Sequence, residues 1–160
     1  MISASAVASE VVIIQAPAEL VWSLLIDFKR YSEWNSFCPS IKSTLQLGAA
    51  VEMMTDLGFG LQPQVEYISC IESPNKIAWS MKNEPDDPIH ACRSQFVTPL
   101  CDSSCSYYTI DDFSGEQMAL MLSKQPPRFT TSAGAAQLTF LEGFIKNHKW
   151  VERLLARVET

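Results

Sequence analysis

The last stretch of the chain, Ala133 to Val158, constrains the fold most, because it has the pattern of one long amphipathic helix. It contains no proline, and apolar side chains recur at steps of three and four residues, the spacing of neighbours on one helix face. Lysines and arginines fall on the opposite face, and two polar residues, Gln137 and His148, interrupt the apolar stripe. A helix of this length has to bury its stripe against a large partner, which the preceding chain must supply.

The preceding chain consists of short apolar or alternating runs separated by turn residues, which is typical of strands. A first strand is expected over 9–15, a helix from Pro17 to about Asp27, and a second short helix or ordered turn over 29–37. Further strands are expected over 41–46, 50–55, 64–72, 76–81, 89–98 and 104–113, with Leu57 to Pro63 as a loop and Pro99 to Ser103 as a connection.

This order is one strand, two helices, about six strands and one long helix. Consecutive strands joined by short turns predict an antiparallel sheet. The stretch from Ser114 to Ser132 is long and partly apolar, with Pro126 and Pro127 in its middle. It is either a lid over a binding site or a plain crossover packed on the sheet edge.

Composition favours a single soluble domain over residues 1–160 and excludes several function classes. The chain is 47% hydrophobic and 19% charged, and its net charge of −6 argues against nucleic-acid partners and against anionic membranes. Neither a signal peptide nor a run long enough to span a membrane is found, so a cytoplasmic protein is expected. Five cysteines and two histidines at irregular spacings make a metal site improbable. Cys101 and Cys105 either pair across a turn or, as we favour, stay free thiols.

Several local motifs resemble one known family. The run from Val12 to Trp22 resembles its opening, a strand, then Ala-Pro, then a helix that carries a tryptophan. Asp27-Phe28, Tyr31 and the run Trp34 to Phe37 resemble its "D-F-x-x-Y-x-x-W-N-P-F" segment, with Ser36 where proline is common. Leu47-Gly48, Ile77 to Trp79, Thr98 to Leu100, Phe113 to Gly115 and Leu141 to Phe144 fit later landmarks. Over nearly the whole chain the sequence therefore resembles the START and Bet v 1-like superfamily, also called SRPBCC, in its polyketide cyclase/dehydrase branch.

The resemblance implies an α+β helix-grip fold. In this fold a curved antiparallel sheet of about six to seven strands wraps around the long C-terminal helix, with two short helices after the first strand and a deep cavity between sheet and helix. Pockets of this kind bind small apolar molecules and orient them with a few polar groups.

Three functions are compatible with such a pocket, because one fold hosts many functions. The first is an enzyme that needs no cofactor and cyclises, dehydrates or isomerises a polyketide-like or other natural-product intermediate. The second is a carrier or sensor of a hydrophobic ligand or lipid. The third is a stress-response regulator of another protein. The expected partner is thus a small hydrophobic molecule, bound by a monomer or homodimer without membrane insertion.

Three residues are candidates for proton transfer. His90 suits a general acid or base, because an unperturbed histidine side chain titrates near neutrality, although a histidine at a strand end is often a surface residue. Tyr107 and Asp111 share one face of the last strand, and a buried Asp111 would be a credible base, whereas most carboxylates are solvated. Arg93 lies three residues after His90, so only one of the two points inward on a regular strand. We expect the inward face to be that of His90, Cys92, Ser94 and Phe96.

The candidates for ligand binding are mostly aromatic or sulfur-containing side chains, with a few polar anchors. Asn35 would donate to a ligand carbonyl or bond the local backbone instead, and Arg93 would bind a carboxylate or enolate oxygen if it points inward. The full expected set is Trp34, Asn35, Phe37, Trp79, Arg93, Phe113, Met118, Met121, Phe129, Gln137, Phe140 and Phe144. Both main functions require a cavity larger than a few water molecules.

Overall fold

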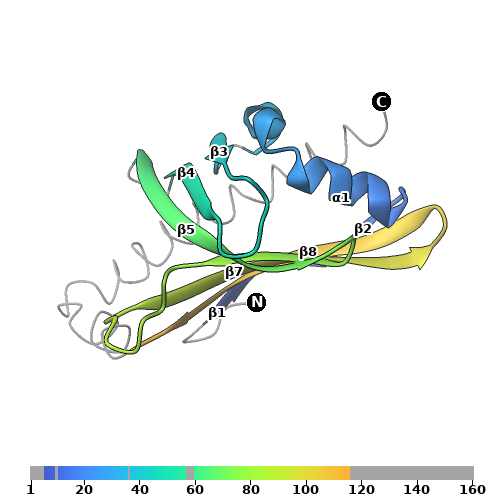
Figure 1. Cartoon of the computed structure of the whole chain (residues 1–160). Helices are drawn as coiled ribbons and strands as arrows, with labels where there is room; N and C mark the ends of the chain where they lie inside the picture. Colours follow the sequence, from blue (N-terminus) through green and yellow to red (C-terminus); the bar gives the residue numbers. More distant parts are fainter. Residues whose placement is uncertain (1–5, 10, 36, 57–59, 116–160) are drawn as a thin grey trace, which may run out of the picture.

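A computed structural model describes residues 6–9, 11–35, 37–56 and 60–115 of the chain. Two short helices and eight strands form in these residues (Figure 1). The helices are α1 (Ala18–Ile26) and the 3-10 helix η1 (Phe28–Glu33). The strands are β1 (Ala6–Ala8), β2 (Val12–Ile14), β3 (Ser40–Lys42), β4 (Ala50–Asp56), β5 (Leu61–Glu72), β6 (Lys76–Ser80), β7 (His90–Cys101) and β8 (Ser104–Ser114).

The strands make one antiparallel sheet in the order β1-β8-β7-β6-β5-β4-β3, and β2 also pairs with β8. The first strand, predicted over 9–15, is thus only Val12–Ile14, and β1 precedes it on the same edge of the sheet. Ser9, between β1 and β2, continues the hydrogen bonding to β8. Its amide donates to the Thr109 carbonyl, and the Thr109 amide donates to Ser9 Oγ. The antiparallel sheet is confirmed, while the expected long helix over 133–158 lies outside the described residues.

Three other boundaries differ from the prediction. β3 ends at Lys42, and Leu45 has a φ of 55°, which an extended strand does not tolerate. β5 begins at Leu61, inside the predicted loop. β7 continues through Pro99 to Cys101, because β6 pairs with β7 only as far as Phe96 and leaves the proline without a neighbour on that side.

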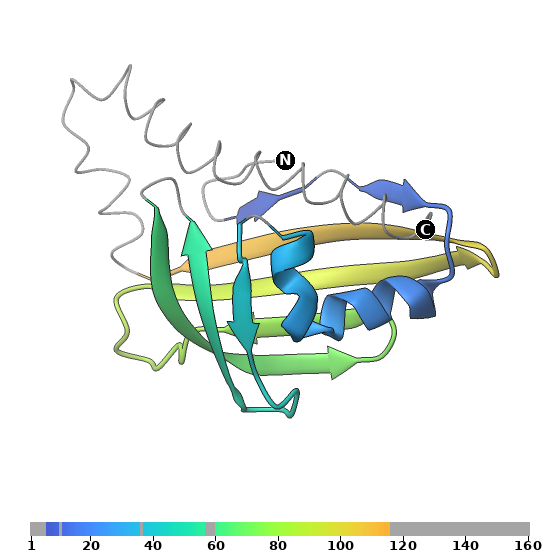
Figure 2. The same ribbon diagram turned by 90° about the horizontal axis from the view of Figure 1, so that it is seen from above.

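The two helices cover one face of the sheet, which we call the inner face (Figure 2). Pro17 precedes α1, Glu19 lies in its first turn, and Val21 and Leu25 are completely buried. They pack in one hydrophobic core with residues of the central strands, including Ile77, Val97 and Tyr107. Val51 and Met53 share one face of β4 and are buried there, at 0% and 5% exposure. Among the described residues, no helix is both long enough and apolar enough to cross a bilayer.

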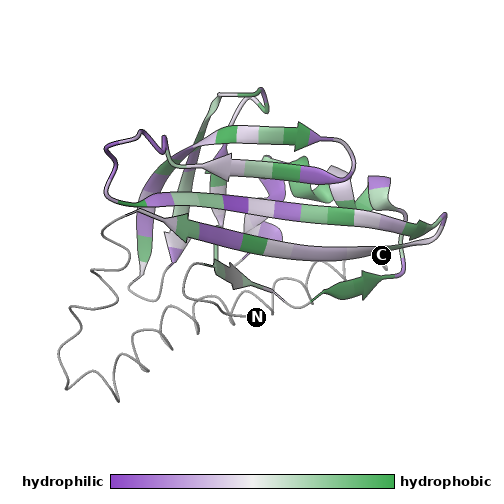
Figure 3. Cartoon of the chain, turned by 90° about the horizontal axis from the view of Figure 1, so that it is seen from below, coloured by the Kyte–Doolittle hydropathy of each residue, from purple (hydrophilic) through white to green (hydrophobic). Residues whose placement is uncertain are grey.

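Seen from its other face, the sheet has hydrophilic and hydrophobic residues mixed along its strands (Figure 3). Phe96 and Tyr108 stack there with ring centroids 4.6 Å apart, and the Lys76 ammonium lies 5.2 Å from the Phe96 centroid. This outer face therefore has its own aromatic contacts and is separate from the core under α1.

Candidate functional site

A row of directly opposed residues crosses the inner face and brings polar groups into the core. Ile68 of β5 opposes Trp79 of β6, Trp79 opposes Arg93 of β7, and Arg93 opposes Asp111 of β8. Side chains directly opposite in antiparallel strands point to the same face. Trp79 is 2% exposed within the core, so Arg93 and Asp111 also lie on the inner face.

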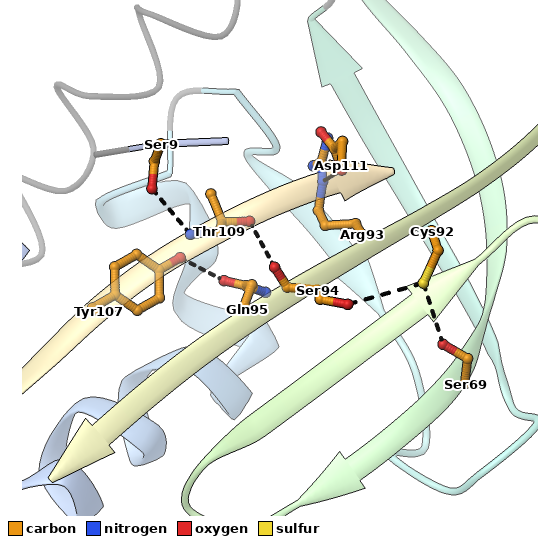
Figure 4. A network of polar contacts seen from close by, with 9 residues as sticks. All are labelled: Ser9, Ser69, Cys92, Arg93, Ser94, Gln95, Tyr107, Thr109 and Asp111. Carbon is orange, nitrogen blue, oxygen red and sulfur yellow. Dashed lines mark hydrogen bonds and ion pairs between the residues drawn. The ribbon is translucent and has the colours of Figure 1, made fainter. Parts of the chain in front are cut away.

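Arg93 and Asp111 form a bidentate ion pair (Figure 4). Arg93 Nε donates to Asp111 Oδ1 at 2.7 Å and Nη2 donates to Oδ2 at 2.8 Å. The Phe37 ring lies 4.6 Å from the guanidinium carbon. Burial alone would lower the pKa of Arg93, but the charge of Asp111 outweighs it and the pKa is raised. The guanidinium is thus a fixed, permanently charged group in the core.

Hydrogen bonds next to the ion pair hold the neighbouring polar groups in place. The Tyr107 hydroxyl donates to Gln95 Oε1 at 2.9 Å, and Thr109 Oγ1 donates to the Ser94 carbonyl at 3.1 Å (Figure 4). The Tyr31 hydroxyl donates to the Leu25 carbonyl at 2.7 Å. Burial raises the pKa of both tyrosines, so both stay protonated at neutral pH.

A small cavity lies where η1 and its following loop meet these strands. It offers about 20 Å³ to the centre of a water molecule, room for roughly one or two waters. The larger cavity expected between the sheet and the long helix stays a prediction, because the helix lies outside the described residues. The lining of the small cavity is half aromatic or thiol and half polar: Tyr31, Asn35, Phe37, Cys38, Trp79, Arg93, Gln95 and Thr109.

One of the residues that line the cavity also carries an unpaired donor. Trp79 Nε1 is buried and has no hydrogen-bond partner among the described residues. Asn35 instead bonds the local backbone, the role favoured for it from the sequence, since its Oδ1 accepts from the Cys38 amide at 2.8 Å.

Glu66 is a titratable group near the ion pair that the sequence analysis missed. It opposes Val51, which is completely buried on the inner face. Burial raises the pKa of Glu66 to about 7, although Arg93 lowers it, and Asp111 adds to the rise. A carboxyl with this pKa exchanges protons at neutral pH, which suits a general acid or base.

The expected orientation of β7 is wrong. Arg93 and Gln95 line the cavity, and Val97 belongs to the core under α1, so the alternate residues His90, Cys92, Ser94 and Phe96 face the other way. His90 Nε2 lies 2.9 Å from the Glu84 carbonyl in the acidic loop. Arg93 can lie on the inner face because Asp111, directly opposite on β8, compensates its charge. The sequence of β7 alone gives no information about such a partner on another strand.

The other predicted site residues separate into three groups. Asn35, Phe37, Trp79 and Arg93 line the cavity, and their role in binding stays a prediction. Trp34 and Tyr107 are buried beside it, with the Trp34 ring 4.5 Å from that of Tyr31, and Phe113 lies beyond Asp111 near the end of β8. Residues outside the described chain are Met118, Met121, Phe129, Gln137, Phe140 and Phe144.

The five cysteines are all free. Cys101 is exposed near the β7–β8 turn, whereas Cys105 is buried, and they are not opposed in the ladder, because Cys101 pairs with Ser104 and Pro99 with Cys105. The favoured prediction of free thiols is thus confirmed for this pair.

The sheet and the two short helices after its first strands form a START-like fold, and solved structures confirm the resemblance found in the sequence at the level of the fold. Solved structures match it over nearly the whole chain. A START superfamily protein from Mycobacterium smegmatis is 16% identical with a TM-score of 0.60, and the match covers 97% of each chain. The Zhui aromatase/cyclase from a Streptomyces species is 17% identical with a TM-score of 0.67, over 96% of this chain and 93% of that one.

A third match is the di-domain aromatase/cyclase BexL, 8% identical with a TM-score of 0.57, over 90% of this chain and 45% of that one. No protein-family model and no curated protein sequence matches the chain. Identities this low show the fold and leave the activity open.

Proposed function

We propose that this protein binds a small, mainly apolar molecule at the inner face of the sheet and catalyses a cofactor-independent cyclisation, dehydration or isomerisation of it. The observation that carries the proposal is the buried Arg93–Asp111 pair beside the cavity. Two ionisable groups that point inward within hydrogen-bond distance are what an enzyme of this fold needs, whereas an all-apolar interior with one polar anchor suits a carrier. The names of two matching structures, both aromatase/cyclases, support the same choice.

The chemistry available is proton transfer next to a carbonyl group. The Arg93 guanidinium stabilises negative charge that develops on the ligand oxygen when a neighbouring C–H proton leaves. Glu66, with a pKa of about 7, accepts that proton and returns it at another carbon or to a leaving hydroxyl. Asp111 keeps Arg93 in position through its two hydrogen bonds and is itself fully occupied by them.

A carrier or sensor of a hydrophobic ligand is the second candidate, because both carboxylate oxygens of Asp111 are bound by Arg93 and are not available to move a proton. The hydroxyls of Tyr31 and Tyr107 are moreover occupied by protein acceptors.

One experiment separates the two functions. Native mass spectrometry of the purified protein first shows whether a small molecule copurifies. Hydrogen–deuterium exchange at the methyl group of 2-acetylnaphthalene is then followed by NMR in D₂O, because an enzyme that removes a proton next to a carbonyl accelerates it. We expect wild type to accelerate exchange and Glu66→Gln to slow it at least about tenfold. Glu52→Gln is the matched control, because Glu52 is exposed on the adjoining strand β4. Binding without any acceleration would establish the carrier.

A further inference from the structure

We propose that the indole N–H of Trp79 and the Nη1 group of Arg93 form a two-donor seat for one carbonyl oxygen of the ligand, so that Trp79 selects acyl compounds over hydrocarbons. The inference rests on the proposed function and deepens it, because it names the ligand group that the inner face recognises.

Trp79 provides the first donor. The residue is 2% exposed, it lines the cavity, and its Nε1 has no acceptor among the described residues. Leaving a buried donor unpaired costs about 1–3 kcal/mol, so an acceptor in the cavity regains that free energy. The Phe28 ring meets the indole edge to face at 6.1 Å and 89°, which fixes the orientation of the ring.

Arg93 provides the second donor from the neighbouring strand. Its Nε and Nη2 are bound to Asp111, and Nη1 makes no hydrogen bond within the part of the chain that the structure describes. Arg93 is the direct partner of Trp79 in the β6–β7 ladder, so the two side chains rise side by side from the same face. Phe37 stacks on the guanidinium and restricts its rotation.

The size of the cavity fits the oxygen alone. The volume open to the centre of a water molecule is about 20 Å³. This space accepts a carbonyl oxygen with its carbon, whereas a ring system has to remain outside it. The small cavity is therefore the polar end of a binding site.

The charges around the seat favour a ligand that arrives neutral over one that arrives as a carboxylate. Asp111 compensates the charge of Arg93 within the ion pair. Glu66 adds a partly ionised carboxyl, while Cys38, Tyr31 and Tyr107 stay neutral because burial raises the pKa of each. A carboxylate ligand would meet no net positive charge, whereas a ketone or ester oxygen needs only the two N–H groups.

The test uses matched probes and the tryptophan indole signals of the full chain. Acetophenone and 2-acetylnaphthalene carry the carbonyl, α-methylstyrene and 2-isopropenylnaphthalene replace its oxygen by CH₂, and benzoate and 2-naphthoate carry a charge. Of the four tryptophan indole N–H signals in ¹H–¹⁵N spectra, the one lost in Trp79→Phe should move downfield with the ketones only. Ketones should bind at least about tenfold more tightly than their isosteres and than the carboxylates, because a buried donor left unpaired penalises the wrong ligand.

Variants separate the seat from the fold. Trp79→Phe should weaken ketone binding about tenfold and leave isostere binding within twofold, whereas Trp22→Phe, which removes an indole N–H of α1 outside the cavity, should change neither. Ketones and isosteres that bind equally, with no indole shift, would overturn the seat but not the proposed function. Failure of every probe to bind would overturn both. If Trp79→Phe does not fold, the wild-type indole shift and the ketone-to-isostere ratio decide the matter.

Discussion

Arg93 lies directly opposite Asp111 in the β7–β8 ladder and donates a hydrogen bond to each of its carboxylate oxygens, at 2.7 and 2.8 Å. The side chains are 18% and 7% exposed, so the pair is largely removed from water. Buried pairs of this kind gain little net stability over an apolar replacement, because the desolvation of two charges offsets their attraction. The pair is therefore better explained by a function in ligand binding than by the needs of the fold.

Removing one partner of this pair should be far more costly than removing both. Arg93→Met leaves the Asp111 carboxylate buried and unpaired and should lower the free energy of unfolding by about 3–5 kcal/mol, measured by urea denaturation at pH 7. Arg93→Met combined with Asp111→Leu should recover most of that loss. Neither variant should bind 2-acetylnaphthalene like wild type.

The control for this prediction is the exposed pair of Arg30 and Glu33, which also joins an arginine to a carboxylate but has side-chain exposures of 52% and 35%. Arg30→Met should change the free energy of unfolding by less than about 1 kcal/mol. If the Arg93→Met variant loses as little stability as the control, the Arg93–Asp111 pair is screened by water like the exposed pair.

Substitution of His90 should leave ligand binding unchanged, because β7 turns this residue to the outer face. His90→Gln retains a nitrogen able to reach the Glu84 carbonyl, now 2.9 Å from His90 Nε2. We expect its affinity for 2-acetylnaphthalene, measured by isothermal titration calorimetry, to stay within about twofold of wild type. Asp111→Asn should weaken binding about tenfold or more, since an amide cannot hold both donors of Arg93 as an anion does. A His90→Gln variant that binds as poorly as Asp111→Asn would refute the orientation of β7.

Local patterns in the sequence predicted the order of elements, and the fold agrees with them from α1 to β8. The face of β7 could not be predicted, because neither set of alternating residues is purely apolar. The decision depends on register: the irregularity between Pro99 and Cys101 places Asp111, and not Asp112, opposite Arg93. Such a one-residue shift leaves no mark in hydrophobic periodicity.

Glu66 was missed for a similar reason. It follows the exposed Val65 and precedes Tyr67 in a strand whose first five residues are all exposed, so its local sequence resembles a solvated edge. Only its pairing with the buried Val51, and the neighbouring Arg93, reveal the inward position. A search for inward carboxylates opposite predicted core residues would have found it once the β4–β5 register was known.

Cys101 should be the thiol that reacts first. It is exposed, and hydrogen bonds from Ser103 and Ser104 lower its pKa to about 7, whereas burial raises the pKa of Cys38 to about 12 and also raises that of Cys105. With limiting iodoacetamide at pH 7.5, peptide mass mapping should find Cys101 modified at least about tenfold faster than the two buried thiols, because the thiolate is the reacting species. Cys101→Ser should abolish the rapid phase. Rapid modification that persists in this variant would assign it to another cysteine.

Glu66 should make the protein less stable as pH rises from about 4.5 to about 7. Burial raises the pKa of Glu66 from 4.5 to about 7 in the folded state, so within this window the folded protein binds the proton and the unfolded chain releases it. Stability therefore falls with rising pH across the window and is constant with respect to this group above it.

Glu66→Gln should remove this component, because the amide is neutral throughout. Relative to wild type, the variant should gain on the order of 1–3 kcal/mol at pH 8 and nothing at pH 4, measured by urea denaturation across the range. Glu52→Gln, on the exposed side of β4, should follow the wild-type curve. A wild-type curve parallel to that of Glu66→Gln from pH 4 to 8 would mean that Glu66 is solvated, and it would remove this residue from the proposed proton transfer.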